Sequence, residues 1–139
     1  MLAEYLNSFL SHMNVLARRV ASKNNLSLSQ YYTLNSISSN GISMSYLSST
    51  IGIDNSTLTR NINILMQRSL VKKDRSKDDR REFIVILSSK GEKVVNKLDN
   101  QMESLINTLI SDINPESRQE FIDTIEQLNW KISGYIHEL

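Results

Sequence analysis

Apolar residues recur with helical spacing at both ends of the chain. Near the N-terminus they alternate spacings of four and three residues, which is the heptad pattern of one helical face. This pattern predicts a helix from residue 2 to about residue 22, with one face formed by Leu2, Leu6, Phe9, Met13, Leu16 and Val20. The same spacing predicts a C-terminal helix, with one face formed by Phe121, Ile125, Leu128, Ile132, Tyr135 and Leu139.

A long helix is predicted just before the C-terminal one. Ser89 and Glu92 match a capping box, in which a serine and an acidic residue three positions later satisfy the first amides of a helix. Apolar residues then repeat with helical spacing to about Ile113. Asn114 and Pro115 supply a cap and a proline at the first helical position, so the last helix is expected to begin there.

Two short helices are predicted in the first half of the chain. One begins at Ser27 or Ser29, either of which can act as its cap, and ends near residue 38. The next begins after Ser43 and ends before Gly52, where the chain needs a residue that adopts a left-handed conformation. A third helix follows so closely that the two together predict a helix-turn-helix.

The third helix leads directly into a basic β-hairpin. Asp54 or Asn55 caps this helix, and its buried stripe comprises Leu58, Ile62, Leu65 and Met66. Val71–Arg75 and residues 82–87 then read as two strands with a polar tip between them. Ile42 is expected to supply a short strand that pairs with the hairpin.

This order of elements predicts a mainly α protein built around a winged helix-turn-helix, with a three-helix core and a β-hairpin wing. We assign residues 27–91 to the winged helix-turn-helix and residues 92–111 to a long connecting helix. Residues 1–22 and 112–139 are assigned to dimerisation helices, because the central region can form its core without them. The residues expected in the dimer interface are Leu2, Leu6, Phe9, Phe121, Ile125, Leu128, Ile132 and Tyr135. The alternative is that these amphipathic helices pack on their own domain.

The charge is distributed unevenly along the chain, although the formal net charge is only +1. Residues 54–97 carry eleven Lys and Arg against six Asp and Glu, whereas residues 98–139 carry two against eight. A basic centre and an acidic end predict that the centre meets a polyanion. The alternative is a chance distribution of solvated charge.

The helix after the turn has the residues expected of a recognition helix. Short polar side chains and Arg60 stand near its N-terminal end, where they would reach base edges and phosphates in the major groove. The residues expected to contact DNA are Asn55, Ser56, Thr57, Thr59, Arg60 and Asn63. Taken alone, the same pattern would also fit an ordinary amphipathic surface helix.

The hairpin concentrates basic residues beside this helix. An arginine at its tip would enter the minor groove, where the negative potential is deepest. Asp79 is expected to hold the Arg81 guanidinium in position. The further residues expected to contact DNA are Lys72, Lys73, Arg75, Lys77, Arg80 and Arg81. A solvated turn of mixed charge is the alternative.

Composition excludes several kinds of chemistry. The chain has no cysteine, so thiol catalysis, disulfides and cysteine-based zinc sites are impossible. Its two histidines, His12 and His137, lie near opposite ends, and no catalytic constellation, metal site or cofactor site stands out. We therefore expect neither an enzyme nor a metalloprotein. The sequence shows no apolar run long enough to span a membrane and no signal peptide. A soluble cytoplasmic protein is therefore expected.

Several short motifs resemble those of the MarR family of prokaryotic transcription regulators, and the resemblance covers nearly the whole chain. The matching segments are Leu28-Ser29-Gln30-Tyr31-Tyr32-Thr33-Leu34, Ser56-Thr57-Leu58-Thr59-Arg60, Leu70-Val71, Asp79-Arg80-Arg81 and Leu87-Ser88-Ser89-Lys90-Gly91. The resemblance implies an obligate homodimer joined through its terminal helices and a pseudo-palindromic operator. It also implies a small phenolic or lipophilic molecule as a candidate effector.

The sequence therefore predicts a homodimeric regulator that binds specific double-stranded DNA, acts as a repressor and is released by a small effector. The alternative is a winged-helix module that contacts another protein and binds no DNA. A steep loss of duplex binding with added salt would separate the two, because phosphate contacts release counterions. The sequence does not identify the operator or the regulated genes. It also does not distinguish a repressor from an activator, or establish an effector or its identity.

Overall fold

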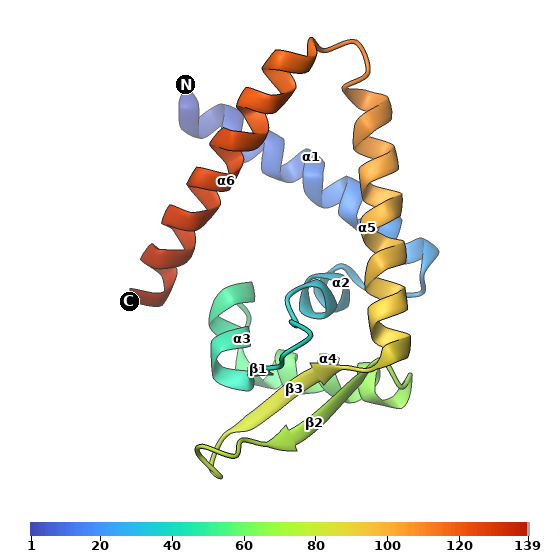
Figure 1. The fold of residues 1–139 in the computed structure, drawn as a ribbon, viewed down its shortest axis with the longest axis vertical. Coiled ribbons are helices and arrows are strands. Elements are labelled where there is room, and N and C mark those ends of the chain that lie inside the picture. The colour runs from blue at the N-terminus through green and yellow to red at the C-terminus, as the bar shows by residue number, and fades with distance from the viewer. Residues whose placement is uncertain (139) are drawn as a thin grey trace. The chain divides into compact units, whose positions relative to one another are not determined.

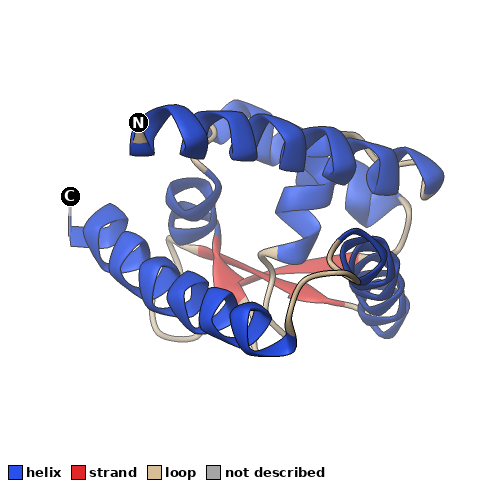
Figure 2. Cartoon of the chain, turned by 90° about the horizontal axis from the view of Figure 1, so that it is seen from above, coloured by secondary structure: helices blue, strands red, loops and turns tan. Residues whose placement is uncertain are grey.

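A computed structural model describes residues 1–138; Leu139, which the heptad pattern places on the last helix, lies outside the described residues. Over these residues the chain is mainly helical and has one small antiparallel sheet, as Figures 1 and 2 show. The predicted fold class is thus confirmed. The elements in order are α1 (Leu2–Lys23), α2 (Leu28–Asn35), β1 (Ile42–Ser43), α3 (Met44–Ile51), α4 (Asn55–Gln67), β2 (Val71–Arg75), β3 (Phe83–Leu87), α5 (Ser89–Leu109) and α6 (Pro115–Glu138).

The chain divides into two compact units, of which the first spans Met1–Met102. Its core joins the last turns of α1 to α2, α3, α4, the sheet and the start of α5. The expectation that the central region forms its core without the first helix is therefore wrong, because Ala17, Val20 and Ala21 are buried in that core. Full burial of a large apolar side chain stabilises a fold by about 1.5–3 kcal/mol. The large apolar side chains with at most 1% of their surface exposed are Leu34, Leu47, Leu58, Ile62, Leu65, Leu70, Val85 and Leu98.

Capping side chains start the short helices where the sequence predicts them. Ser27 begins α2, because its hydroxyl accepts from the Gln30 amide while the Gln30 side chain accepts from the Ser27 amide. Ser43 caps α3, and Gly52 ends it in the left-handed region at φ +72°. The structure therefore chooses Ser27 over Ser29 as the cap of α2 and confirms both predicted boundaries of α3.

The predicted capping box at Ser89 is wrong, because Ser88 caps α5 instead. Ser88 Oγ accepts from the Gly91 amide (2.9 Å) and donates to the carbonyl oxygen of Ser69 (2.6 Å). The Ser88 amide is also bonded to the Leu70 carbonyl oxygen (3.0 Å), which fixes Ser88 at the end of the wing. A Cβ on Gly91 would lie 1.9 Å from that same oxygen, so only glycine allows this approach of α5 to the wing.

The sheet has the order β1-β3-β2 with antiparallel pairing throughout. Ile42 pairs with Val85, which confirms the short strand predicted beside the hairpin. The second strand of the hairpin begins one residue later than predicted. Glu82 belongs to the turn, because its amide donates to the Asp79 carbonyl oxygen (3.0 Å) and its own carbonyl oxygen accepts from Ser76 (2.8 Å).

The second unit begins at Glu103 and contains the end of α5 and all of α6. Helix α5 ends at Leu109, about one turn earlier than predicted. Asn114 Oδ1 accepts from the Glu116 amide (2.8 Å) and Pro115 is the first helical residue, so the predicted start of α6 is confirmed. None of the described residues of α6 is buried. No described helix combines the length and the apolar character needed to cross a membrane.

Candidate DNA interface

Helix α4 is anchored through one face and presents the other to solvent. Leu58, Ile62 and Leu65 on the anchored face are fully buried, whereas Met66, predicted on the same stripe, is half-buried. Asn61 is also buried, and its amide group donates to the hydroxyl oxygens of Ser29 (2.7 Å) and Thr33 (3.2 Å) on α2. This polar anchor is not predicted from the sequence, although Asn61 is spaced like the other residues of the buried stripe.

The N-terminal end of α4 is held by its cap. Asp54 Oδ1 accepts from the Thr57 amide (2.7 Å), and Oδ2 accepts from the Thr57 hydroxyl (2.8 Å). The bond from the Thr57 amide, followed by the bond from its hydroxyl, lowers the pKa of the Asp54 carboxyl below its ordinary value. Thr57 therefore donates its hydroxyl hydrogen within the cap. The other polar residues predicted to contact DNA from α4 are exposed: Asn55, Ser56, Thr59, Arg60 and Asn63.

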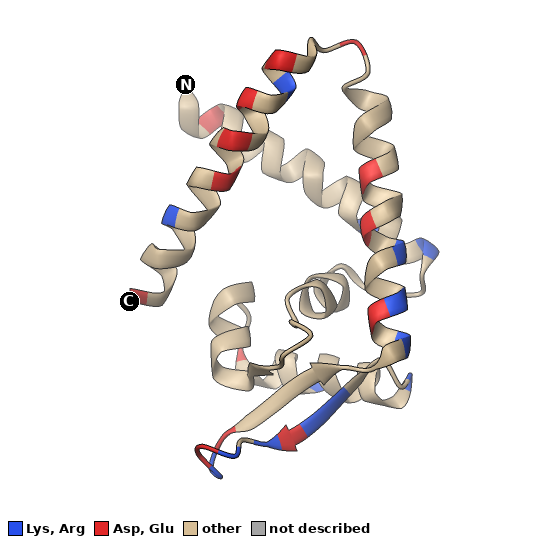
Figure 3. Ribbon diagram, in the orientation of Figure 1, with Lys and Arg blue, Asp and Glu red and all other residues tan. Residues whose placement is uncertain are grey.

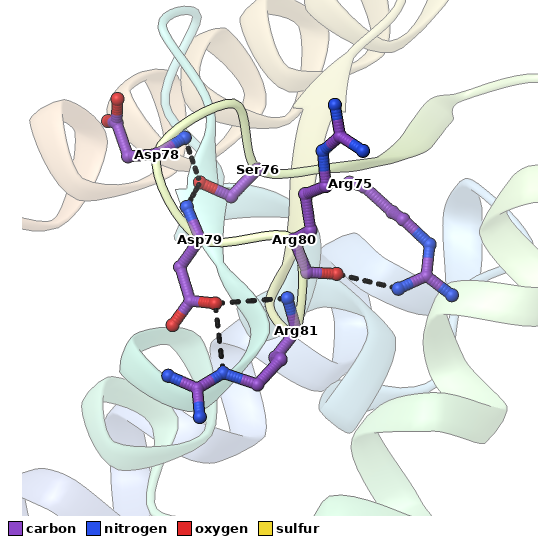
Figure 4. A network of polar contacts seen from close by, with 6 residues as sticks. All are labelled: Arg75, Ser76, Asp78, Asp79, Arg80 and Arg81. Carbon is purple, nitrogen blue, oxygen red and sulfur yellow. Dashed lines mark hydrogen bonds and ion pairs between the residues drawn. The ribbon is translucent and has the colours of Figure 1, made fainter.

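The wing consists of β2, β3 and the tip formed by residues 76–82, where Asp79 and Arg81 are joined (Figure 4). Asp79 Oδ1 accepts from the Arg81 amide (3.0 Å) and from Arg81 Nε (3.2 Å). Ser76 Oγ accepts from the amides of Asp78 (3.2 Å) and Asp79 (3.3 Å) and so shapes the turn. The Arg81 side chain is 92% exposed. The Asp79 carboxylate holds the guanidinium through Nε, and the exposed side chain leaves its positive charge open to solvent.

Two more cations of the wing lie against an aromatic ring. Lys73 Nζ is 4.4 Å and Arg75 Cζ is 4.9 Å from the centre of the Phe83 ring. The strand register explains the contact, because Arg75 is paired directly with Phe83 across the hairpin. Arg75 also donates to the Arg80 carbonyl oxygen (2.6 Å), as Figure 4 shows. These contacts restrict both long side chains to one face of the wing.

A shallow depression joins α4 to the wing. Its volume is about 380 Å³, and it is lined by Met44, Ser45, Asn55, Thr59, Lys73, Arg81, Glu82 and Phe83. Polar residues from the exposed end of α4 thus lie beside two cations of the wing. The surface combines hydrogen-bonding groups with positive charge, which are the two components of a DNA-reading site. We call this depression the α4–wing groove.

Comparison with known proteins identifies the chain. A sequence model of the transcriptional regulator SarA/Rot family matches residues 15–98, which include α2, the helix-turn-helix, the wing and the first half of α5. The chain belongs to the SarA/Rot family of transcriptional regulators. It is accordingly a winged-helix regulator of transcription, which implies that it binds DNA. Its relatives are regulators rather than enzymes.

Individual relatives support the assignment over nearly the full length. The HTH-type transcriptional regulator TcaR of Staphylococcus aureus (strain Newman) is 23% identical over 95% of this chain and 91% of its own. The transcriptional regulator BldR from Sulfolobus solfataricus superposes with a TM-score of 0.75 at 26% identity, covering 91% of this chain and 92% of its own. A MarR transcriptional regulator from Methanosarcina mazei Go1 has the same fold, with a TM-score of 0.79, 20% identity and 94% coverage of both chains. The MarR resemblance of the sequence is therefore confirmed.

Only some of the residues predicted to bind DNA line the α4–wing groove of this SarA/Rot-family regulator. Asn55, Thr59, Lys73 and Arg81 line it. Lys72 lies on the opposite face of the hairpin, since neighbouring residues of a strand point to opposite sides. The other predicted residues outside the groove that remain exposed are Ser56, Arg60, Asn63, Arg75, Lys77 and Arg80. Figure 3 shows basic positions along β2 and at the wing tip.

The groove also contains residues that the sequence analysis did not single out. Ser45 lies in the first turn of α3, and its hydroxyl donates to Glu82 Oε1 of the wing (2.7 Å). Only the folded chain reveals this pair, because 37 positions separate the two residues. In the part of the chain that the structure describes, no three His, Cys, Asp or Glu side chains are grouped closely enough to hold a metal ion.

Proposed function

We propose that this regulator binds specific sites in double-stranded DNA as a homodimer and represses transcription from them. The α4–wing groove carries the proposal, because it sets the exposed end of a recognition helix beside Lys73 and Arg81. In this arrangement α4 enters the major groove and the wing tip reaches the neighbouring minor groove. The operator is pseudo-palindromic, since a two-fold dimer reads two similar half-sites.

The residues divide between reading bases and binding phosphates. Arg60 reads guanine through two donors, and exposed Asn55, Ser56, Thr59 and Asn63 contact base edges or phosphates beside it. Thr57 takes part through its methyl group or as an acceptor, because its hydroxyl hydrogen is bound by the cap. Arg81 enters the minor groove. The remaining wing cations supply phosphate contacts: Lys72, Lys73, Arg75, Lys77 and Arg80.

The dimer forms through the terminal helices, residues 1–22 and 112–139. Both helices expose apolar side chains in the single chain: Leu2 is 73% exposed on α1, and Tyr135 is 68% exposed on α6. Large apolar side chains exposed along a helix favour a protein interface. Residues 27–91 then read DNA, and residues 92–111 connect this DNA-binding region to the dimerisation helices.

A small phenolic or lipophilic effector releases the protein from DNA. Tyr31 and Tyr32 on α2 pack edge to face, with ring centres 5.4 Å apart, and are candidates to contact it. Burial raises the pKa of both phenols further above their ordinary value of 10.0, at which they are already neutral at physiological pH. Thiol oxidation is not the release signal, because the chain has no cysteine. We place the regulator in the cytoplasm, with the DNA it controls.

Selection from a random duplex library tests the proposal. The full-length protein should recover a common pseudo-palindromic site, and binding to it should weaken steeply as salt rises. A winged-helix module that contacts another protein would recover no common sequence and would show no such salt dependence. That result would refute the DNA-reading assignment.

A further inference from the structure

The lysines of α5 lie outside the α4–wing groove. Lys90, Lys93 and Lys97 follow one another at spacings of three and four residues, which places them on one face of the helix. All three are exposed. The acidic residues Glu92 and Asp99 are seven residues apart and lie on a different face of α5. The lysine face is therefore a continuous basic surface.

Hydrogen bonds hold the ends of α4 and α1 against this side of α5. Lys90 Nζ donates to the carbonyl oxygen of Arg68, just after the last turn of α4 (3.0 Å). Arg68 donates to the carbonyl oxygens of Asn25 (2.8 Å) and Asn24 (3.1 Å), in the turn after α1. The Asn24 side chain in turn donates to Gln101 Oε1 on α5 (2.7 Å). Three segments that are distant in sequence are thus fixed side by side.

Together these segments form a basic edge, defined by Lys23, Arg68, Lys90, Lys93 and Lys97. Lys23 joins it as the last residue of α1. Figure 3 shows basic positions gathered in the N-terminal half of α5, on the side of the turn that follows α1. Within residues 1–138, no acidic side chain forms an ion pair with any of these five cations. Among the described residues, the charge of the edge is therefore not balanced by an ion pair.

We propose that this basic edge binds the phosphates of DNA that flanks the operator, outside the base pairs read by α4. The inference rests on the proposed function. The edge begins at the C-terminal end of α4, about 20 Å along the helix from the end that contacts bases. From Lys90 to Lys97 it continues for about 10 Å along α5, and duplex DNA carries about six phosphates in that length. Lysine ammonium groups bind phosphates as point charges, so the contact is independent of flanking sequence.

An acidic protein surface is the competing occupant. Glu116, Glu120 and Asp123 form an acidic stripe on α6, which a second copy would present to the basic edge. DNA fits the position better, because the edge is continuous with the end of the recognition helix. If DNA occupies the edge, removal of its charge should weaken DNA binding. If an acidic protein surface occupies it, removal of the charge should weaken self-association.

The test uses the double variant Lys93→Gln/Lys97→Gln of the full-length protein. Lys90 is left in place because it bonds to Arg68. The charge-preserving variant Lys93→Arg/Lys97→Arg is the matched control. Two duplexes carry the same site recovered from a random library: a short one of about 20 base pairs and a long one with unrelated flanks on both sides. Binding is measured by fluorescence anisotropy over a series of salt concentrations, and the contacts on the long duplex are mapped by footprinting.

The wild-type protein should bind the long duplex more tightly and protect its flanks. The Gln variant should lose about tenfold or more on the long duplex at low salt and less than twofold on the short one. Its salt slope on the long duplex should fall by about 2 per chain, while the Arg variant behaves like the wild type. These results would support the inference.

Equal affinities of the wild-type protein and the Gln variant on the long duplex would overturn the inference and leave the proposed function standing. A loss of self-association at low salt, with DNA binding unchanged, would assign the edge to an acidic protein surface instead. If the wild-type protein recovers no site and does not bind the short duplex specifically, the proposed function itself fails.

Discussion

Ser45 Oγ donates a hydrogen bond of 2.7 Å to Glu82 Oε1, and this bond joins the first turn of α3 to the wing. Both residues line the groove that also contains Asn55 and Arg81. The wing is also held by the core, by the Ser88 junction and by the pairing of Ile42 and Ser43 with Val85 and Ile84 of β3. The Ser45–Glu82 bond therefore acts further out, where the wing must be aligned with the exposed end of α4.

Ser45→Ala should weaken specific DNA binding without unfolding the protein. Because the bond is exposed, its loss should cost about 0.5–1.5 kcal/mol at most in stability, while affinity for the cognate site falls by roughly threefold to tenfold. Ser49→Ala is the control, since its hydroxyl donates only to the carbonyl oxygen of Ser45 within α3. Anisotropy titrations on cognate and random duplexes make the comparison. Equal losses for the two variants would show that the bond does not position the wing.

Arg81→Ala should weaken binding to the cognate site by about 1–3 kcal/mol. Arg81 is oriented by Asp79 and exposed at the wing tip, so it is placed to enter a minor groove. Lys77→Ala should cost less and should do so equally on cognate and random DNA, because an exposed lysine contacts phosphates without sequence preference. Small, equal losses for both variants on the cognate duplex would contradict the role assigned to Arg81.

Gly91→Ala should destabilise the fold by about 1–3 kcal/mol or more, because the new methyl group would collide with the Leu70 carbonyl oxygen. Gly134→Ala is the matched control. Apart from its neighbours along the chain and the nearby backbone of α6, no described atom lies within 4 Å of a Cβ built on Gly134, which is inside α6. It should therefore stabilise the protein by up to about 1 kcal/mol through helix propensity. Urea denaturation compares the two; a neutral Gly91→Ala would show that the junction of wing and α5 is loose.

Stability should depend on the charge of Asp54 at low pH. Its pKa is lowered in the folded protein, so the carboxylate stabilises the fold above its ordinary value of 3.8 and this contribution is lost as the pH falls through the lowered pKa. Asn at this position still caps the helix but does not titrate. Asp54→Asn should therefore show a smaller fall in stability between pH 5 and pH 2. Urea unfolding at several pH values checks this, and identical pH profiles would contradict it.

Ile132→Asp should convert the proposed dimer into a monomer. Ile132 is 45% exposed in the single chain and lies on the apolar face of α6. Burying a new carboxylate in the interface would be strongly unfavourable. Ser133→Asp places the same charge on another face of α6 and should leave the dimer intact. Light scattering at micromolar concentration distinguishes the outcomes, and a dimer that survives Ile132→Asp would exclude this face of α6 from the interface.

Local signals in the sequence predicted most of the fold. Ser43 and Gly52 act within their own turns, so their roles as cap and stop were predictable from residue type. The sequence pattern places the cap of α5 one residue too late, because the choice of Ser88 depends on its bonds to Ser69 and Leu70 across the wing. The periodic spacing of apolar residues does not predict hydrogen bonds between residues that are distant in the sequence.

The site was less predictable than the fold for the same reason. The residue types of a recognition helix and a basic wing indicate DNA, but they do not show which side chains meet. Asn61 on the buried side of α4 and the Ser45–Glu82 bond both depend on partners more than 25 positions away. The structure alone places Arg81 beside the end of α4 and leaves Lys72 on the other face of the wing.

The most direct test of the account is the affinity of the wild-type protein and of Arg60→Ala for a selected duplex and a random duplex, measured by anisotropy over a range of salt concentrations. The account predicts that the wild-type protein strongly prefers the selected duplex, with two chains bound per site and a steep loss of affinity as salt rises. Arg60→Ala should remove most of this preference while keeping the weaker binding to random DNA. Equal affinity of the wild-type protein for both duplexes, or binding that does not change with salt, would contradict the claim that α4 and the wing read DNA.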